Sequence, residues 1–431
     1  MNDDSISETA RLSRAIEDHL RGAGADLESL RGFLVKKERL SPREAGELAG
    51  TVAGKLNRER FPPVTEMELM LTEDCDQRCD YCFVEEKGSS PPMSPAVARQ
   101  AVDFLFQESR NYPRVKILFF GGEPLLAWDR IREVTEYAEE RGRQSGQEVV
   151  FNMTTNASLL ERSRCDFLAR HRIKYLISID GPREIHDRHR RRPDGRSSYG
   201  LIADKIPLLK KYQPWLGARL TVHPDTAADL PGSFSHLVEL GFNQFLIGPA
   251  SGVEWSERDL DLYRDGMIEI ARRLKLELDR GRQLRVNSLE ENLKMRSGKR
   301  YYRGCRAGRQ SVTVTGDGLI HPCSKMLGVA GREGIPPLGT LEEGITALNY
   351  RLRLCGLIPV GNSACDSCPW EDFCPGGCFA VNYQETGDIF RPAPFECRVQ
   401  ERTIQMMRAA EPILGPEYFK AAADRLRRKS P

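Results

Sequence analysis

The sequence lacks an unbroken apolar run long enough to cross a bilayer, and its charges nearly cancel. Its 64 basic and 62 acidic residues give a net charge of +2, which provides no general attraction to nucleic acid or to anionic membranes. The acidic, polar start Met1–Asp4 differs from a secretory signal. We therefore expect a cytoplasmic protein with no nucleic-acid partner and no membrane partner. Thiols stay reduced in that compartment, so disulfides are not expected.

No internal repeat stands out. The 431 residues, of which 40% are hydrophobic, indicate two or three globular domains. The 12 cysteines are unevenly placed: three lie within residues 75–82, and seven belong to a pattern that runs from Cys305 to Cys397. Only Cys165 and Cys355 belong to neither group. This distribution favours several metal sites over scattered buried thiols.

The first group, Cys75, Cys79 and Cys82, has the spacing C-x3-C-x2-C. A [4Fe–4S] cube has four irons and normally takes four thiolates, so a compact set of three suits a cube whose last iron binds something other than protein. Structural zinc is the alternative. Zinc sites usually show two cysteine pairs that give four ligands, and no fourth Cys or His lies close to this run. The spacing therefore favours an iron–sulfur cluster.

This cysteine run, with Tyr81 just before the last cysteine, resembles the signature of radical S-adenosylmethionine (SAM) enzymes. In that family the open iron binds the amino and carboxylate groups of SAM, and the reduced cluster cleaves SAM to a 5′-deoxyadenosyl radical. The resemblance implies that Cys75, Cys79 and Cys82 hold the SAM cluster. It also implies a place for Tyr81 near adenine, although a core aromatic residue is an equally good interpretation.

Residues 1 to about 60 have a helical pattern, in which Leu12, Ile16 and Leu20 share one face. Ser41 and Glu44 form a capping box at the start of a second helix. From about 65 to 285, short apolar runs alternate with amphipathic stretches, which predicts a parallel sheet with crossover helices. Six such units fit the partial (β/α)6 barrel of the TIM type that the resemblance implies. The expected strands are Glu66–Thr72, Val115–Phe120, Val149–Thr155, Tyr175–Asp180, Ala218–His223 and Gln244–Gly248.

In a parallel barrel the ligand chemistry lies at the C-terminal ends of the strands. Gly121, Gly122 and Glu123 follow the second strand, where the glycines let the backbone approach a ligand closely. The carboxylate beside them can hold a protonated amine. The segment resembles the family motif that contacts the SAM amino group.

Asn156 ends the third strand beside Ala157, where glycine is common in the family. Ser178 and Asp180 end the fourth strand with a hydroxyl and a carboxylate that suit ribose. The resemblance supports Ser178 as a SAM contact. Asp180 could instead serve the turn that follows it. One arginine of the basic stretch 186–192 could meet the SAM carboxylate, but a solvated loop is the favoured interpretation.

The second cysteine group resembles the SPASM domain, a C-terminal extension of many radical SAM enzymes that holds two auxiliary [4Fe–4S] clusters. By position, the first auxiliary cluster would take Cys305, Cys323 and Cys378, and the second would take Cys365, Cys368, Cys374 and Cys397. The first set is one ligand short. One iron of that cluster therefore needs another ligand or stays open, and Cys355 could serve from outside the motif. Zinc ribbons are the structural alternative for this region.

The resemblance implies an enzyme of the peptide-maturase branch that oxidatively forms a thioether or carbon–carbon crosslink in a ribosomally made peptide. It would draw electrons from a reductant such as flavodoxin or ferredoxin. The alternative is an anaerobic sulfatase maturase. Those enzymes carry an aspartate base after the cysteine that matches Cys323, where this chain has Ser324. An iron–sulfur carrier or scaffold is the non-enzyme alternative. No catalytic base can be assigned from the sequence.

We expect four segments. Residues 1–62 are a helical N-terminal segment, which either caps the barrel or binds a leader peptide. Residues 63–285 are the radical SAM barrel, residues 286–401 the SPASM domain, and residues 402–431 a C-terminal helix with a basic tail.

Overall fold

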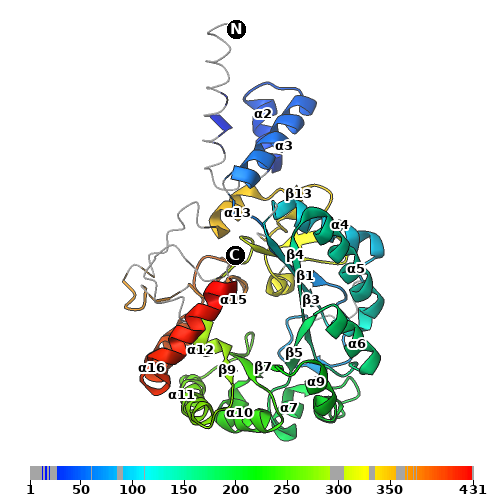
Figure 1. Ribbon diagram of the computed structural model, residues 1–431. Coiled ribbons are helices and arrows are strands. Elements are labelled where there is room, and N and C mark those ends of the chain that lie inside the picture. The colour runs from blue at the N-terminus through cyan, green and yellow to red at the C-terminus, as the bar shows by residue number, and fades with distance from the viewer. Residues whose placement is uncertain are drawn as a thin grey trace.

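The computed structural model is an α/β protein in which helices surround a large, mostly parallel sheet (Figure 1). It describes residues 27–59, 61–84, 91–110, 112–291, 305–329, 335–355 and 376–429. It also describes positions 12, 15, 16, 19, 365, 367–371, 373 and 374, so every cysteine of the two predicted groups is included. Leu20, which the sequence places on a helical face, lies outside the described residues.

The six strands expected from the sequence are all present, are adjacent in the sheet and pair in parallel. Their bounds are β1 Glu66–Met70, β3 Arg114–Phe120, β4 Glu148–Thr155, β5 Lys174–Ser178, β7 Gly217–Val222 and β8 Gln244–Pro249. The sheet is open, because β9 (Arg285–Val286) forms one edge and β13 (Gly344–Ile345) forms the other. The predicted α/β fold with an unclosed parallel sheet is therefore confirmed.

Helices cover the outer face of this sheet. In β3, Val115, Ile117 and Phe119 are fully buried and join the main core with helix residues, whereas the alternate residues Lys116 and Leu118 are only half-buried. Successive strand residues point to opposite faces, so the alternate residues form an inner face turned away from these helices. The main outer helices are α4 Pro95–Glu108, α5 Trp128–Ser145, α6 Arg162–Arg170, α10 Leu230–Glu239 and α11 Glu257–Asp279.

The Cys-rich segment extends the same sheet, which the sequence did not predict. Strand β10 (Ser311–Val314) pairs in parallel with β1, on the side opposite β3. Strands β11 (Leu319–His321), β12 (Gly339–Thr340) and β13 then continue antiparallel. These strands are two to four residues long, too short to give a recognisable alternation.

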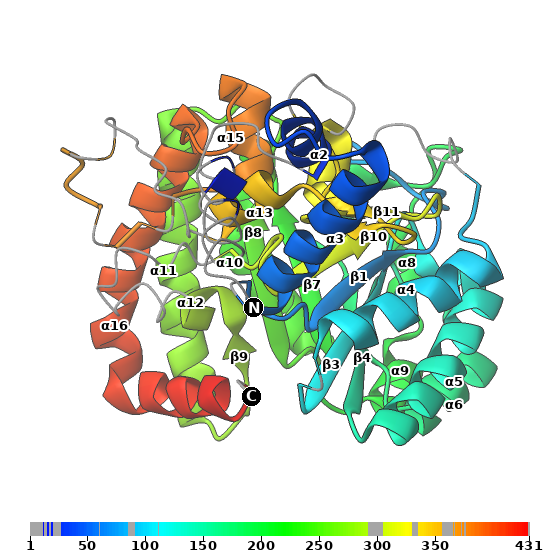
Figure 2. The same cartoon turned by 90° about the horizontal axis from the view of Figure 1, so that it is seen from above.

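The C-terminal helix begins earlier than the expected position near 402. Helix α16 runs over Pro394–Lys429, with non-helical backbone at Gly415, and lies along α11 (Figure 2). Arg402 joins the two helices by ion pairs to Glu257 and Asp261.

The remaining elements are β2 Arg78–Cys79, β6 Arg190–Arg191, α7 Arg183–His189, α8 Tyr199–Ala203, α9 Ile206–Tyr212, α12 Asn287–Glu291, α15 Phe379–Thr386, and the short helices η1 Pro124–Ala127, η2 Pro224–Asp229 and η4 Ser324–Val329.

At the N-terminal end, α2 (Leu27–Lys36) and α3 (Pro42–Glu59) form a small separate core with α13 (Leu348–Leu354). The predicted capping box is present: the backbone N–H of Ser41 donates to Glu44 Oε2 at 3.0 Å, and the Glu44 N–H donates to Ser41 Oγ at 3.3 Å. In the part of the chain that the structure describes, no helix is both long and apolar enough to span a bilayer.

Candidate functional site

The three N-terminal cysteines lie in one loop that follows β1. Cys79 belongs to β2, which pairs antiparallel with β6 so that Cys79 faces Arg190. The Cys82 N–H donates to the Cys79 carbonyl at 3.1 Å, which closes the loop into a turn, and none of the three thiols is in a disulfide. Burial raises the pKa of Cys75 to about 12. The position of Cys75 therefore favours a neutral thiol until a cation binds, as expected of a metal ligand.

Gly121 and Gly122 make a close backbone contact that the sequence did not suggest. The N–H groups of Gly122 and Glu123 donate to the carbonyls of Thr72 and Asp74, both at 2.8 Å. A Cβ atom on either glycine would come closer than 3.0 Å to one of these carbonyl oxygens, and Gly121 has a φ of +139°. The glycines thus allow the backbone to pack closely against the chain that leads into the cysteine loop, and their contact with SAM stays a prediction.

Glu123 is 1% exposed, and its carboxylate lies at the end of β4. It accepts hydrogen bonds from Thr155 Oγ1 at 2.7 Å, from the Asn156 N–H at 2.8 Å and from the Leu125 N–H at 3.1 Å. Burial outweighs these hydrogen bonds and raises the pKa of Glu123 to about 7. A cationic group beside it would favour the ionised carboxylate.

Asn156 ties the end of β4 to the cysteine loop. Its Nδ2 donates to Asp76 Oδ1 at 2.6 Å and lies 3.9 Å from Cys75 Sγ. The Ser158 hydroxyl donates to the other oxygen of Asp76. Ala157 between them has a φ of 62°, in the left-handed region. That backbone conformation favours glycine. This explains why glycine is common at the position of Ala157 in the family that the sequence resembles.

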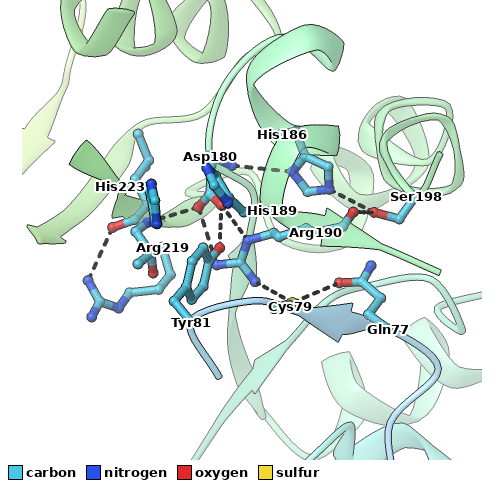
Figure 3. Close-up of polar contacts among 12 residues, drawn as sticks. Gln77, Cys79, Tyr81, Asp180, His186, His189, Arg190, Ser198, Arg219 and His223 are labelled. Atoms are coloured by element: carbon cyan, nitrogen blue, oxygen red, sulfur yellow. Dashed lines mark hydrogen bonds and ion pairs between the residues drawn. The ribbon is translucent and has the colours of Figure 1, made fainter. Parts of the chain in front are cut away.

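Asp180 is the centre of a buried network (Figure 3). It forms a two-point ion pair with Arg190, at 2.7 Å and 3.2 Å, and accepts the Thr221 N–H at 2.8 Å and the Tyr81 hydroxyl. Burial opposes ionisation of Asp180, but Arg190 prevails and holds its pKa below the ordinary value. Both carboxylate oxygens are used within the protein. This favours a role in positioning Arg190 over a direct ribose contact.

His186 supports the same network from α7. The Asp180 N–H points to His186 Nδ1 at 3.4 Å, and His186 Nε2 lies 2.9 Å from Ser198 Oγ. Burial lowers the pKa of His186 to about 4, so that the imidazole is neutral at physiological pH. The Ser198 hydroxyl donates to the Arg190 carbonyl at 2.6 Å and so fixes the backbone that carries the guanidinium.

Two arginines at the site were not assigned from the sequence. Arg190 is the buried arginine of the basic stretch, and its guanidinium lies 5.2 Å from the centre of the Tyr81 ring. Nothing in that stretch distinguishes Arg190 from its neighbours. Arg219 lies on β7, opposite Ser178 of β5, and donates to the carbonyls of Leu220 and Leu246 at 3.3 and 3.4 Å. Within the described residues it has no carboxylate partner. The signal in the sequence that could have identified Arg219 is its position inside an otherwise apolar strand.

The structure brings the Cys-rich segment together as two sets of thiols. Burial and then the neighbouring thiolates Cys378 and Cys305 raise the pKa of Cys323. Similarly, burial and then Cys374, Cys365 and Cys368 raise the pKa of Cys397 to about 11. The grouping is the same as the predicted ligand assignment, which stays a prediction.

Cys355 lies apart from both sets. It packs in the small apolar core with α2 and α3, and its charged neighbours are Arg351 and Arg309 rather than other cysteines. This position does not favour Cys355 as the missing ligand of the first set.

The open parallel sheet, with three thiols and a buried acidic network at the C-terminal ends of its strands, defines a barrel-type α/β protein with a cysteine-bearing loop. Residues 69–251 match the family model described as the radical SAM superfamily. The chain therefore contains a radical SAM domain.

Among curated relatives, the chain is similar to a serine-type anaerobic sulfatase-maturating enzyme of Klebsiella aerogenes. The two are 23% identical over 319 residues, which cover 70% of this chain and 76% of the relative. It is also 22% identical to the radical SAM cyclopropyl synthase TigE of Paramaledivibacter caminithermalis, over 78% of this chain and 72% of that protein.

Two solved structures share the fold. Native anSMEcpe with bound S-adenosylmethionine superposes with a TM-score of 0.66 at 18% identity, over 83% of this chain and 99% of that one. Streptococcus suis SuiB bound to its precursor peptide SuiA gives a TM-score of 0.56 at 17% identity, over 83% and 81% of the two chains. At these identities the likeness supports the fold alone.

Proposed function

We propose that the chain is a radical SAM enzyme that cleaves SAM reductively and oxidatively crosslinks a ribosomally made peptide through a thioether or carbon–carbon bond. The observation that carries the first part is the single loop that presents Cys75, Cys79 and Cys82 beside Glu123 and Asn156. Three thiols without a fourth protein ligand suit a cube that keeps one iron for SAM. When bound there, such a cluster would supply the electron that generates the 5′-deoxyadenosyl radical.

The chain's own residues would bind and orient SAM. Glu123, held by three hydrogen bonds, is the carboxylate available for the SAM ammonium group. Arg190, fixed by Asp180, offers its remaining N–H donor to an anionic group near Cys79, since Nη1 lies 3.9 Å from that sulfur. The half-buried Ser178 hydroxyl, which has no hydrogen bond within the described residues, suits a ribose oxygen.

The peptide substrate and the two auxiliary clusters form the finer part of the proposal. Seven cysteines in two sets would hold clusters that can accept an electron from a substrate radical, which suits a net oxidation. SuiB was solved with its precursor peptide, and TigE is named as a cyclopropyl synthase. The SuiB structure supports a peptide as the substrate class here.

Sulfatase maturation is the second candidate, because two of the relatives reported above are such enzymes. Ser324 stands against it. A serine hydroxyl is a poor base unless a neighbour activates it, and the Ser324 backbone N–H is what donates to Glu68, at 3.2 Å.

The test is anaerobic reconstitution with iron and sulfide, followed by dithionite and SAM. We expect 5′-deoxyadenosine from the parent protein and about 12 irons per chain, the content of three cubes. Cys79→Ala should abolish the deoxyadenosine, while Cys165→Ala, a buried thiol of α6, should leave it unchanged. Full deoxyadenosine formation by Cys79→Ala would refute the proposal, and a colourless protein with zinc would refute the auxiliary clusters.

A further inference from the structure

Glu68 connects the radical SAM strand β1 to the Cys-rich segment. Parallel pairing of β1 with β10 places Glu68 opposite Thr313. The Thr313 hydroxyl donates to Glu68 Oε2 at 2.8 Å, and the N–H of Ser324, the residue after Cys323, donates to the same oxygen at 3.2 Å. One oxygen of Glu68 is thus fixed by the Cys-rich segment. Its other oxygen, Oε1, has no hydrogen bond to any residue that the structure describes.

The same carboxylate lies beside the cysteine set that is one ligand short. Ser324, whose N–H donates to Glu68 Oε2, directly follows Cys323, and Glu68 interacts electrostatically with both Cys305 and Cys323. Glu68 therefore adds an oxygen donor beside the half-buried thiols of Cys305 and Cys323, which form the first set with Cys378. The four groups together provide the four donors that a cube needs.

Two other carboxylates near these cysteines are less suitable. Glu66, two residues earlier on β1, is used by Arg306 and by Lys116 at 3.5 Å. Glu396 accepts the Cys378 N–H at 3.1 Å, but it affects the pKa of Cys374 and Cys397, which belong to the second set. That second set already has four thiols.

We propose that Glu68 supplies the fourth ligand, through a carboxylate oxygen, to the iron–sulfur cluster held by Cys305, Cys323 and Cys378. This inference rests on the auxiliary clusters of the proposed function. A carboxylate is a harder ligand than a thiolate, so it gives one iron a distinct electronic environment. The cluster would then be closed by a residue of the radical SAM strand, and any substrate ligation would have to displace Glu68.

The experiment compares the Mössbauer spectra of the parent and of three variants, each prepared as full-length protein reconstituted with ⁵⁷Fe. The variants are Glu68→Gln, Glu68→Cys and the matched control Glu66→Gln, which lies on the same strand. Difference spectra against the parent remove the contributions of unchanged clusters. We expect Glu68→Gln to change about one iron in 12, one corner of one of three cubes. Glu68→Cys should convert the same iron to thiolate ligation, and Glu66→Gln should give no difference.

A blank difference spectrum for Glu68→Gln would overturn the inference. Glu68→Gln could instead lose about four irons, the content of one cube. In that case, recovery of these irons in Glu68→Cys supports residue 68 as a cluster ligand. Loss of the same irons in Glu68→Cys overturns the inference. A parent protein with only one cube would fail the proposed function itself, before Glu68 is tested.

Discussion

Asn156 Nδ2 donates to Asp76 Oδ1 at 2.6 Å, which fastens the end of β4 to the middle of the cysteine loop. Backbone contacts of residues 72–74, the short β2–β6 pairing and the hydrogen bond from Tyr81 to Asp180 also hold the loop in place. Two side chains, the Asn156 amide and the Ser158 hydroxyl, therefore hold Asp76 in the loop segment that lies between Cys75 and Cys79.

We predict that Asn156→Ala weakens retention of the SAM cluster. Loss of a group that orients metal ligands typically lowers metal affinity by about 10- to 100-fold. The measurement is iron release to a chelator, followed at the cluster absorbance. Asn152→Ala, on the same strand but with no contact to the loop, is the control. Equal release rates for the two variants would show that Asn156 does not position the loop.

Gly122→Ala should destabilise the protein strongly. Its Cβ would come closer than 3.0 Å to backbone atoms of both Asp74 and Glu73, which cannot move aside as a flexible side chain could. Overpacking of this kind costs about 1–3 kcal/mol or more. Urea unfolding of the variant should show the loss. Gly46→Ala in α3, where a Cβ meets nothing within 4 Å, should instead be neutral or stabilising by up to about 1 kcal/mol. A neutral Gly122→Ala variant would mean that the loop packing differs from that described.

Asp180→Asn should remove about 3–5 kcal/mol of stability, because it leaves the buried Arg190 guanidinium without its counter-charge. Chemical denaturation of the cluster-free protein measures the change in the free energy of unfolding. Asp194→Asn, which breaks an exposed ion pair with Arg196, should give no measurable change. Equal effects of the two substitutions would contradict the network described around Asp180.

The raised pKa of Glu123 predicts a pH dependence in the cluster-free protein. The folded state binds this proton up to about pH 7, whereas the unfolded state releases it near 4.5. The contribution of Glu123 to stability is therefore fully present below pH 4.5 and is lost as the pH rises through 7, a change of a few kcal/mol. Subtracting the stability profile of Glu123→Gln from that of the parent should isolate this slope. A flat difference between pH 4.5 and 7.5 would exclude the raised pKa.

The cysteine spacings and the alternating strand–helix pattern were sufficient to predict the sheet and the position of the cysteine loop. Both are local signals, which depend on residues close together in the chain. The packing of the two glycines was missed, because the sequence does not show that Thr72 and Asp74 lie against them. The partner of Asp180 was missed for the same reason. Arg190 is one of several arginines in its stretch, and only the tertiary fold buries it.

Glu68 was the least predictable residue. Its partner Thr313 is 245 residues away, and β10 is only four residues long. Pairings between such short and distant strands have no counterpart in hydrophobic periodicity.

The pairing of β1 with β10 also has a consequence for biosynthesis. Strand β1 leaves the ribosome long before its partner 245 residues later, a delay of tens of seconds at bacterial elongation rates. During that interval one edge of the nascent sheet has unpaired backbone groups, which invite association with other chains. We expect slow translation or scarce chaperones to reduce the soluble yield, and expression at low temperature together with a holdase to restore it.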